Sequence, residues 1–130
     1  MYEAVTRNIR VKVEPTFDSN RSAPQSHRYF WIYAIEITNE GDMPVRLVAR
    51  HWEIMDARGN RENVDGPGVV GEMPTIEPGT SFSYSSGCPL TTPSGIMVGT
   101  YEMVLPDGRS FDCAIPAFSL DSPHSAPTVN

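Results

Sequence analysis

The chain has 130 residues, of which 39% are hydrophobic and 20% charged, so we predict one globular domain rather than a disordered segment. Its formal net charge is −6, and its 10 Lys and Arg residues are scattered. Proteins that bind nucleic acid or anionic lipid carry basic patches, so both classes of function are disfavoured. No apolar run is long enough to span a membrane, and Met1–Ala4 lacks the features of a signal peptide.

The two cysteines, Cys88 and Cys113, could pair only in an oxidising compartment. Without a secretion signal they are predicted to be reduced, buried thiols. The sequence predicts no cofactor.

Alternation of apolar and polar residues dominates the first half of the chain. Residues 9–14 predict a strand that stops at Pro15, because proline cannot donate a ladder hydrogen bond. A polar stretch, residues 18–25, predicts a loop. The clearest strand follows, with aromatic and branched residues on one face: Tyr29, Trp31, Tyr33, Ile35 and Ile37. Its other face is apolar for part of its length, so this strand is predicted to be central.

The second half repeats the pattern with many turn signals. A change of phase near His51 predicts a bulge in the strand of residues 45–54. Glycine and proline predict a long loop over residues 65–79, and the next strand is predicted to end at Gly87. These signals predict about seven strands and no amphipathic helix. The sequence therefore predicts an all-β antiparallel sandwich over residues 1–120, with a flexible C-terminal tail at 121–130.

Three glycines, Gly66, Gly68 and Gly71, match the G-x-G-x-x-G pattern of dinucleotide-binding proteins. That pattern requires a helix directly after it, and two prolines, Pro74 and Pro78, follow too soon. The glycines more simply allow positive φ in a long loop. An anion-binding nest of N–H groups stays open as an alternative.

His51 and Glu53 are two residues apart on one strand, so both side chains are predicted to lie on one face. They are weak candidates for a metal site, which would need a third ligand. A nucleophile at Cys88 would need a histidine or a helix N-terminus beside it. No spacing predicts such a partner, so no catalytic residues are assigned and the protein is predicted not to be an enzyme.

Several segments, in this order, resemble the bacterial ApaG family, and the resemblance extends from about Tyr2 to Leu120. They are residues 47–56, 64–72, 78–79, 82–87, 99–103 and 115–118. The resemblance implies an immunoglobulin-like or fibronectin-III-like sandwich in a cytoplasmic bacterial protein whose activity is unsettled. It also links the family to cobalt tolerance, magnesium efflux and diadenosine tetraphosphate metabolism. Similar domains in eukaryotic F-box proteins and in a polymerase-delta-interacting protein resemble recruiting modules.

Two functional hypotheses follow. The first is a non-enzymatic module that binds an unknown protein partner, as a monomer or weak homo-oligomer, through the loop that contains Gly66, Gly68, Val69, Val70 and Gly71. Burial of both valines would remove the main support for this hypothesis. The alternative is a protein that binds cobalt or magnesium, or a nucleotide phosphate.

Overall fold

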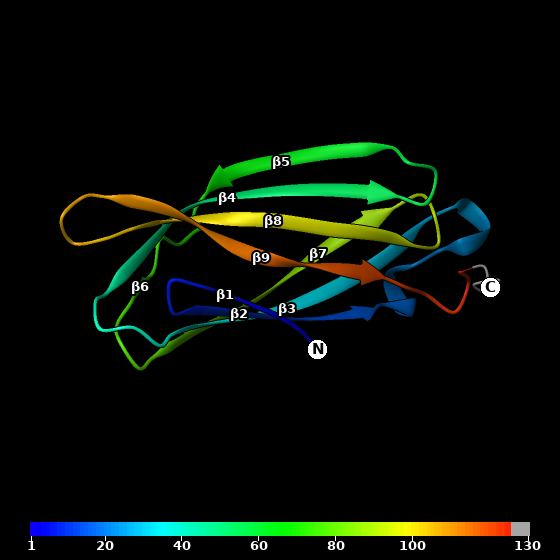
Figure 1. Cartoon of the computed structure of the whole chain (residues 1–130). Coiled ribbons are helices and arrows are strands. Elements are labelled where there is room, and N and C mark those ends of the chain that lie inside the picture. The colour runs from blue at the N-terminus through cyan, green and yellow to red at the C-terminus, as the bar shows by residue number, and fades with distance from the viewer. Residues whose placement is uncertain (126–130) are drawn as a thin grey trace, which may run out of the picture.

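The computed structural model describes residues 1–125 and consists of two antiparallel sheets packed face to face (Figure 1). One sheet has the strand order β1-β2-β3-β7, and the other has the order β5-β4-β8-β9, with β6 paired to β4. The described strands are β1 (Tyr2–Thr6), β2 (Ile9–Phe17), β3 (Tyr29–Asn39), β4 (Val45–Asp56), β5 (Arg61–Pro67), β6 (Thr75–Ile76), β7 (Ser81–Leu90), β8 (Gly95–Val104) and β9 (Ser110–Leu120). Two short 3₁₀ helices, η1 (Ser19–Arg21) and η2 (Pro24–Ser26), lie between β2 and β3.

The predicted all-β sandwich is confirmed, although nine strands are described where about seven were predicted. The core lies between the sheets, and the predicted apolar face of β3 is its centre, with Trp31 at 1% exposure. Period-two alternation produces this result because successive residues of a strand point to opposite faces of the sheet. Tyr33 of one sheet and Trp52 of the other pack edge to face across the core, with ring centroids 5.4 Å apart.

Pro15 does not end its strand, so that prediction was wrong. Phe30 directs its N–H to Ser22 and accepts a bond from the Asp18 N–H, both on the β2 side of β3. Backbone N–H and C=O groups point alternately to either side of an antiparallel strand, so those of Tyr33, the partner of Pro15, point away from β2. The backbone nitrogen and carbonyl of Pro15 therefore point away from β3. The β1 ladder ends at the pair Tyr2 and Val13, so the missing N–H of the proline costs no ladder bond.

Three further boundaries differ from the predictions. Strand β5 continues to Pro67 and β6 occupies part of the predicted loop, whereas β7 continues past Gly87 to Leu90. The predicted bulge exists in β4, but its register shift lies between Leu47 and Ala49 rather than at His51. Strand β1 was not predicted. The predictions gave glycine and proline too much weight as residues that end strands. Strands β5 and β7 lie at sheet edges, where the backbone groups on one side form no ladder hydrogen bonds, so a proline there removes none.

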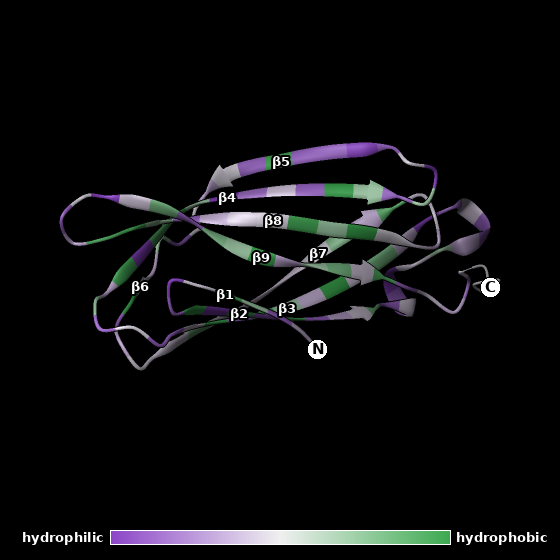
Figure 2. Cartoon of the chain, in the orientation of Figure 1, coloured by the Kyte–Doolittle hydropathy of each residue, from purple (hydrophilic) through white to green (hydrophobic). Residues whose placement is uncertain are grey.

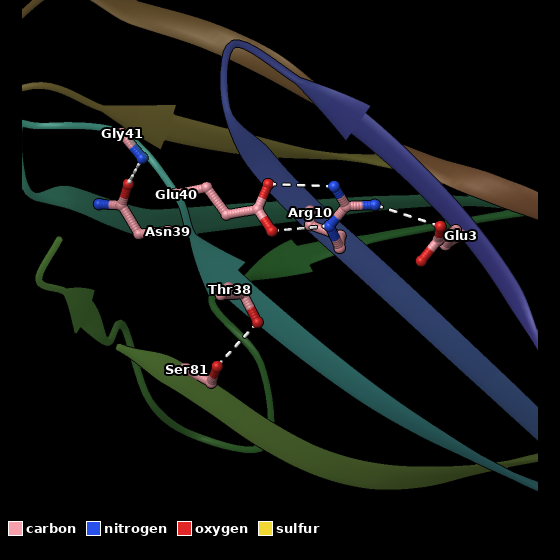
Figure 3. A network of polar contacts seen from close by, with 7 residues as sticks. All are labelled: Glu3, Arg10, Thr38, Asn39, Glu40, Gly41 and Ser81. Atoms are coloured by element: carbon pink, nitrogen blue, oxygen red, sulfur yellow. Dashed lines mark hydrogen bonds and ion pairs between the residues drawn. The ribbon is translucent and has the colours of Figure 1, made fainter. Parts of the chain in front are cut away.

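The buried amide of Asn39 joins the end of β3 to the turn that follows it and to β6, and Figure 3 shows its contact with Gly41. Its side-chain nitrogen donates to the carbonyls of Met43 at 2.8 Å and Ile76 at 2.9 Å. Its side-chain oxygen accepts the N–H of Gly41 at 2.9 Å. All of these polar atoms are therefore satisfied, and residues 39–44, which we call the Asn39 turn, are fixed against β6.

The two lateral margins of the sandwich differ. Strands β1 and β2 pack against β9, where Thr6 Oγ1 accepts the Ala114 N–H at 3.0 Å. On the other margin, β5 and β7 are the edges of their sheets. One margin is therefore closed by contact between the sheets, and the other leaves two strand edges unpaired among the described residues.

The segment that follows β9 was predicted to be a flexible tail over 121–130. The indole of Trp31 donates to the Asp121 carbonyl at 2.8 Å, and the hydroxyls of Ser122 and Ser125 donate to Pro93 at 2.6 Å and 2.9 Å. Residues 121–125 are therefore attached to the sandwich, and the rest of the predicted tail lies outside the described residues. Among the described residues, no helix has the length and apolar character needed to cross a bilayer.

Candidate functional site

The glycine loop, residues 66–72, begins at the end of β5 and closes with a tight turn. The N–H of Val69 donates to the Glu72 carbonyl, and the Glu72 N–H donates back to Val69, both at 2.8 Å. The two residues between them, Val70 and Gly71, have φ values of +44° and +80°. Positive φ at both central residues is the pattern of a type I′ turn, which favours Asn-Gly.

The two valines of this loop have opposite environments. Val69 is 0% exposed and belongs to the core, whereas Val70 is 54% exposed at the tip of the turn. The criterion that both valines be buried is therefore not met. Val70 combines an exposed apolar side chain with a left-handed backbone, and a β-branched residue is rarely found in that conformation.

Gly68 is required by the path of the loop. Its φ is +53°, and a Cβ on it would lie 2.0 Å from the Glu72 carbonyl oxygen. The closing turn therefore approaches the backbone of Gly68 too closely for any side chain.

Arg50 holds the loop against the sheet. Its guanidinium donates to the carbonyls of Pro67 at 2.9 Å and Gly68 at 3.0 Å. A Cβ on Gly66, which pairs with Arg50 across the ladder, would lie 2.9–3.0 Å from the guanidinium atoms. Arg50 was not identified from the sequence. In the alternating pattern of β4, Arg50 looked like a polar residue on the outer face of the sheet. The bulge between Leu47 and Ala49 reverses which residues face outward, and this reversal was not predicted at that position.

Three N–H groups of the glycine loop already have backbone acceptors. Gly68 donates to Val48 at 2.8 Å, and the Val69 and Glu72 donors close the turn. The next element is β6, a two-residue strand, rather than a helix. The requirement for a dinucleotide-binding helix is therefore not met within residues 1–125, and these three donors do not point to an anion.

His51 and Glu53 lie together on the outer face of the β4 sheet, as their spacing predicted. Each has a partner on β5: His51 Nδ1 lies 2.8 Å from Asp65 Oδ1, and Glu53 lies 3.3 Å from Arg61. A hollow of about 360 Å³ beside them also contacts Thr100. Within the part of the chain that the structure describes, no three His, Cys, Asp or Glu side chains are grouped so as to hold a metal ion.

The interior holds weakly acidic groups. Cys88 and Cys113 are free and buried, as predicted, and burial raises the pKa of each thiol to about 11. A thiol with such a pKa is protonated near neutral pH and is a poor nucleophile. The hydroxyls of Tyr84 and Tyr101 lie 2.5 Å apart, and burial raises the pKa of both. No candidate for a catalytic acid or base follows from these groups.

Comparison with known proteins decides the family. A family profile described as the ApaG domain matches residues 19–105. The chain belongs to the ApaG family. Two relatives are each named Protein ApaG. The protein from Paramagnetospirillum magneticum is 53% identical to this chain over the whole of both chains, and the protein from Methylorubrum populi is 56% identical over 95% of each. These names state no enzymatic activity.

Solved structures share this fold. A Bordetella pertussis crystal structure described as an ApaA protein has a TM-score of 0.86 and 40% identity, and covers 90% of this chain and 95% of its own. The C-terminal domain of wzt has a TM-score of 0.55 and 10% identity, covering 99% of this chain and 88% of that domain, which is a likeness of fold alone. The resemblance of the ApaG motifs quoted from the sequence is therefore confirmed.

Proposed function

We propose that this protein is a non-enzymatic module that binds another protein through the tip of its glycine loop. The observation that carries the proposal is Val70, which is 54% exposed with a φ of +44°. A residue held in a sparsely populated backbone region costs of order 1–3 kcal/mol. Asparagine at this position would remove most of that cost, because type I′ turns favour Asn-Gly. Folding alone therefore gives no reason for a valine here, whereas an apolar contact with a partner does.

The surroundings of Val70 support a rigid presentation of its side chain. Val69 anchors the loop in the core, and Arg50 binds the carbonyls of Pro67 and Gly68. A contact residue on a preorganised loop loses little conformational freedom on binding, which favours affinity. The partner is expected to offer an apolar pocket with a neutral or basic rim, because the exposed Glu72 is two residues from Val70 and the chain has a net charge of −6. Free, buried cysteines support the cytoplasm as the compartment.

Affinity capture from extract of the native bacterium tests the proposal. Wild-type protein and Val70→Asn are compared, and partners are quantified by mass spectrometry. Val70→Asn is expected to reduce recovery of a specific partner at least tenfold while leaving the fold intact or more stable. Val5→Thr is the matched control, because Val5 is also exposed, at 49%, but lies in the regularly paired strand β1 of the other sheet.

Equal recovery of every partner by wild type and Val70→Asn would exclude the loop tip as a contact. Val69→Asp is unsuitable for this purpose, because Val69 is buried in the core and a charge there would unfold the domain.

A further inference from the structure

We propose that the free edge of β7 binds an extended segment of another protein as a fifth strand of its sheet. We further propose that this segment carries a Lys or Arg and, four residues away on the same face, an apolar residue. The inference concerns a surface distinct from the glycine loop and does not depend on Val70.

From Ser81 to Cys88 the β7 edge lacks the features that normally prevent strand addition, and a proline, Pro89, occurs only near the end of the strand. Its ten residues, Ser81–Leu90, contain no charged side chain. Natural edges are usually protected by charge, proline, short length or a covering element. By contrast, the β5 edge carries Arg61, Glu62 and Asp65 and ends in Pro67, and Figure 2 shows hydrophilic colour along most of it. The edges of β1 and β9 lie against one another.

Backbone geometry identifies the groups that a partner strand would meet. Phe30 directs its N–H and C=O toward the β2 side. By alternation, Trp31 directs its groups toward its partner Cys88. The intervening residues of β7, Ser83, Ser85 and Gly87 among them, therefore point their N–H and C=O groups away from β3. All three are exposed and have small or absent side chains, so a second backbone can approach them.

The carboxylate of Glu36, on the outer face of this sheet, indicates which side chain the added strand should carry. Across the outer face of this sheet, one row of cross-strand neighbours reads Glu3, Lys12, Glu36 and Ser83. Glu3 and Glu40 bind Arg10 at 3.1 Å and 2.8 Å (Figure 3), and Glu14 lies 3.6 Å from the N-terminal amine. Among residues 1–125 no ion pair involves Glu36. A basic residue opposite Ser83 would continue the alternation of charge along the row.

The surface beside β7 has room for that side chain. A hollow of about 400 Å³ is lined by Lys12, Ala34, Glu36, Ser83 and Ser85, among others. A long basic side chain opposite Ser83 can lie over the serine in this hollow and reach Glu36.

Four residues along β7, Gly87 marks the apolar position. A Cβ there would lie 2.2 Å from Cζ of Phe30, so the aromatic ring covers the glycine backbone near the edge. Its cross-strand neighbour on β3 is the half-buried Ile32. An apolar residue opposite Gly87 would therefore meet the ring of Phe30.

A second copy of this chain is the less suitable occupant. Pairing of β7 with β7 of another copy would bring no charge to Glu36, because β7 contains none. A basic segment of a different protein satisfies both the backbone edge and the free carboxylate.

Selection from a random heptapeptide library displayed on phage, with the folded full-length chain as target, tests the proposal. We expect enrichment of peptides with Lys or Arg and an apolar residue four positions apart. NMR titration with a selected synthetic peptide should shift the amide signals of Ser83, Ser85 and Gly87. Ser85→Pro should weaken binding at least tenfold, because it removes an outward N–H. Ser85→Thr, which keeps that N–H, should bind within threefold of wild type.

Proline is already tolerated in β7 at Pro89, whose backbone groups point away from β3 as those of Ser85 do. If Ser85→Pro nevertheless fails to fold, a second variant tests the role of charge. Glu36→Lys should weaken the selected basic peptide at least fivefold and favour the same peptide with Glu in place of its basic residue. Val70→Asn should bind the peptide as wild type does, so the outcome is separate from that of the loop.

Selected peptides that shift amides elsewhere, that lack a basic preference or that bind Ser85→Pro as tightly as wild type would overturn the proposal. So would failure of the library to yield a binder at β7. A dimer in sedimentation that Ser85→Pro converts to a monomer would assign the edge to a second copy instead.

Discussion

The Asn39 turn and the glycine loop differ in how well their residues suit the fold. In the Asn39 turn, a buried amide satisfies three backbone groups. The glycine loop has equally specific anchors in Val69 and Arg50, yet it ends in a β-branched residue with positive φ whose side chain faces outward. In the Asn39 turn the polar contacts and the backbone agree, whereas in the glycine loop one side chain, Val70, conflicts with its backbone conformation. Of the two turns, only the glycine loop places a β-branched residue at positive φ, which is why the proposed contact was assigned to Val70.

Removal of the Asn39 amide is expected to give the largest effect. Asn39→Ala loses three hydrogen bonds and leaves buried backbone groups unpaired, so the free energy of unfolding should fall by about 3 kcal/mol. Urea denaturation followed by far-UV circular dichroism measures this change. Thr38→Ala, which removes an exposed hydroxyl contact to Ser81 next to the turn, should change it by less than about 0.5 kcal/mol. Similar losses for both variants would contradict the role given to the amide.

Truncation of each valine compares the anchor and the tip of the glycine loop directly. Val69→Ala leaves a cavity in the core and should cost about 2 kcal/mol. Val70→Ala removes exposed atoms and should change the free energy of unfolding by less than about 0.5 kcal/mol. The same denaturation experiment applies, and a larger cost at Val70 than at Val69 would reverse the assignment of anchor and tip.

Replacement of Arg50 isolates the polar anchor. Arg50→Lys keeps the charge but loses the planar fork that reaches two carbonyls, so the protein should lose about 1 kcal/mol of stability. Amide hydrogen exchange should show faster exchange at Gly68 and Glu72 than in the wild type, with β3 unchanged. Uniform acceleration throughout the chain would show that Arg50 supports the whole sandwich rather than the loop.

Relief of strain at the tip should be stabilising. Val70→Asn places the favoured Asn-Gly pair in the type I′ turn and should raise the free energy of unfolding by about 0.5–1 kcal/mol. Thermal denaturation should show a melting temperature a few degrees above that of the wild type. A lower melting temperature would mean that Val70 stabilises the isolated domain, and the comparison between the two regions would lose its basis.

Alkaline pH should affect the wild type and the loop variants equally. Burial raises the pKa of Cys88 and Cys113 to about 11 from an ordinary value of 9, so the folded state retains these protons longer than the unfolded state. This stability is complete below about pH 9 and is lost as the pH rises toward 11, by about 1.4 kcal/mol per pH unit for each thiol at most. Denaturation midpoints at pH 8 and 10 should therefore fall by the same amount in wild type, Asn39→Ala and Val70→Asn. Unequal falls would show that a group in one of the two regions titrates there.

Much of the fold was already determined by the pattern of the sequence. The alternating run of β3 predicted a central strand with Trp31 inside, and that prediction needed no distant residue because strand geometry alone sets the two faces. Several motifs along the chain, the glycine loop among them, likewise indicated the ApaG family. The pairing partners of Pro15 and Pro67 were not predictable locally, since the effect of a proline depends on whether a neighbouring strand lies on its N–H side.

The candidate site depended on tertiary structure to a greater extent. Val69 and Val70 are adjacent and identical in the sequence, and only the turn, the core and the guanidinium of Arg50 assign one to the interior and the other to the surface. His51 and Glu53 were correctly placed on one face, but their partners came from the register with β5. Periodicity follows from the local backbone and can be derived from sequence, whereas burial, register and edge exposure follow from which segments meet, which is decided by the packing of the whole chain.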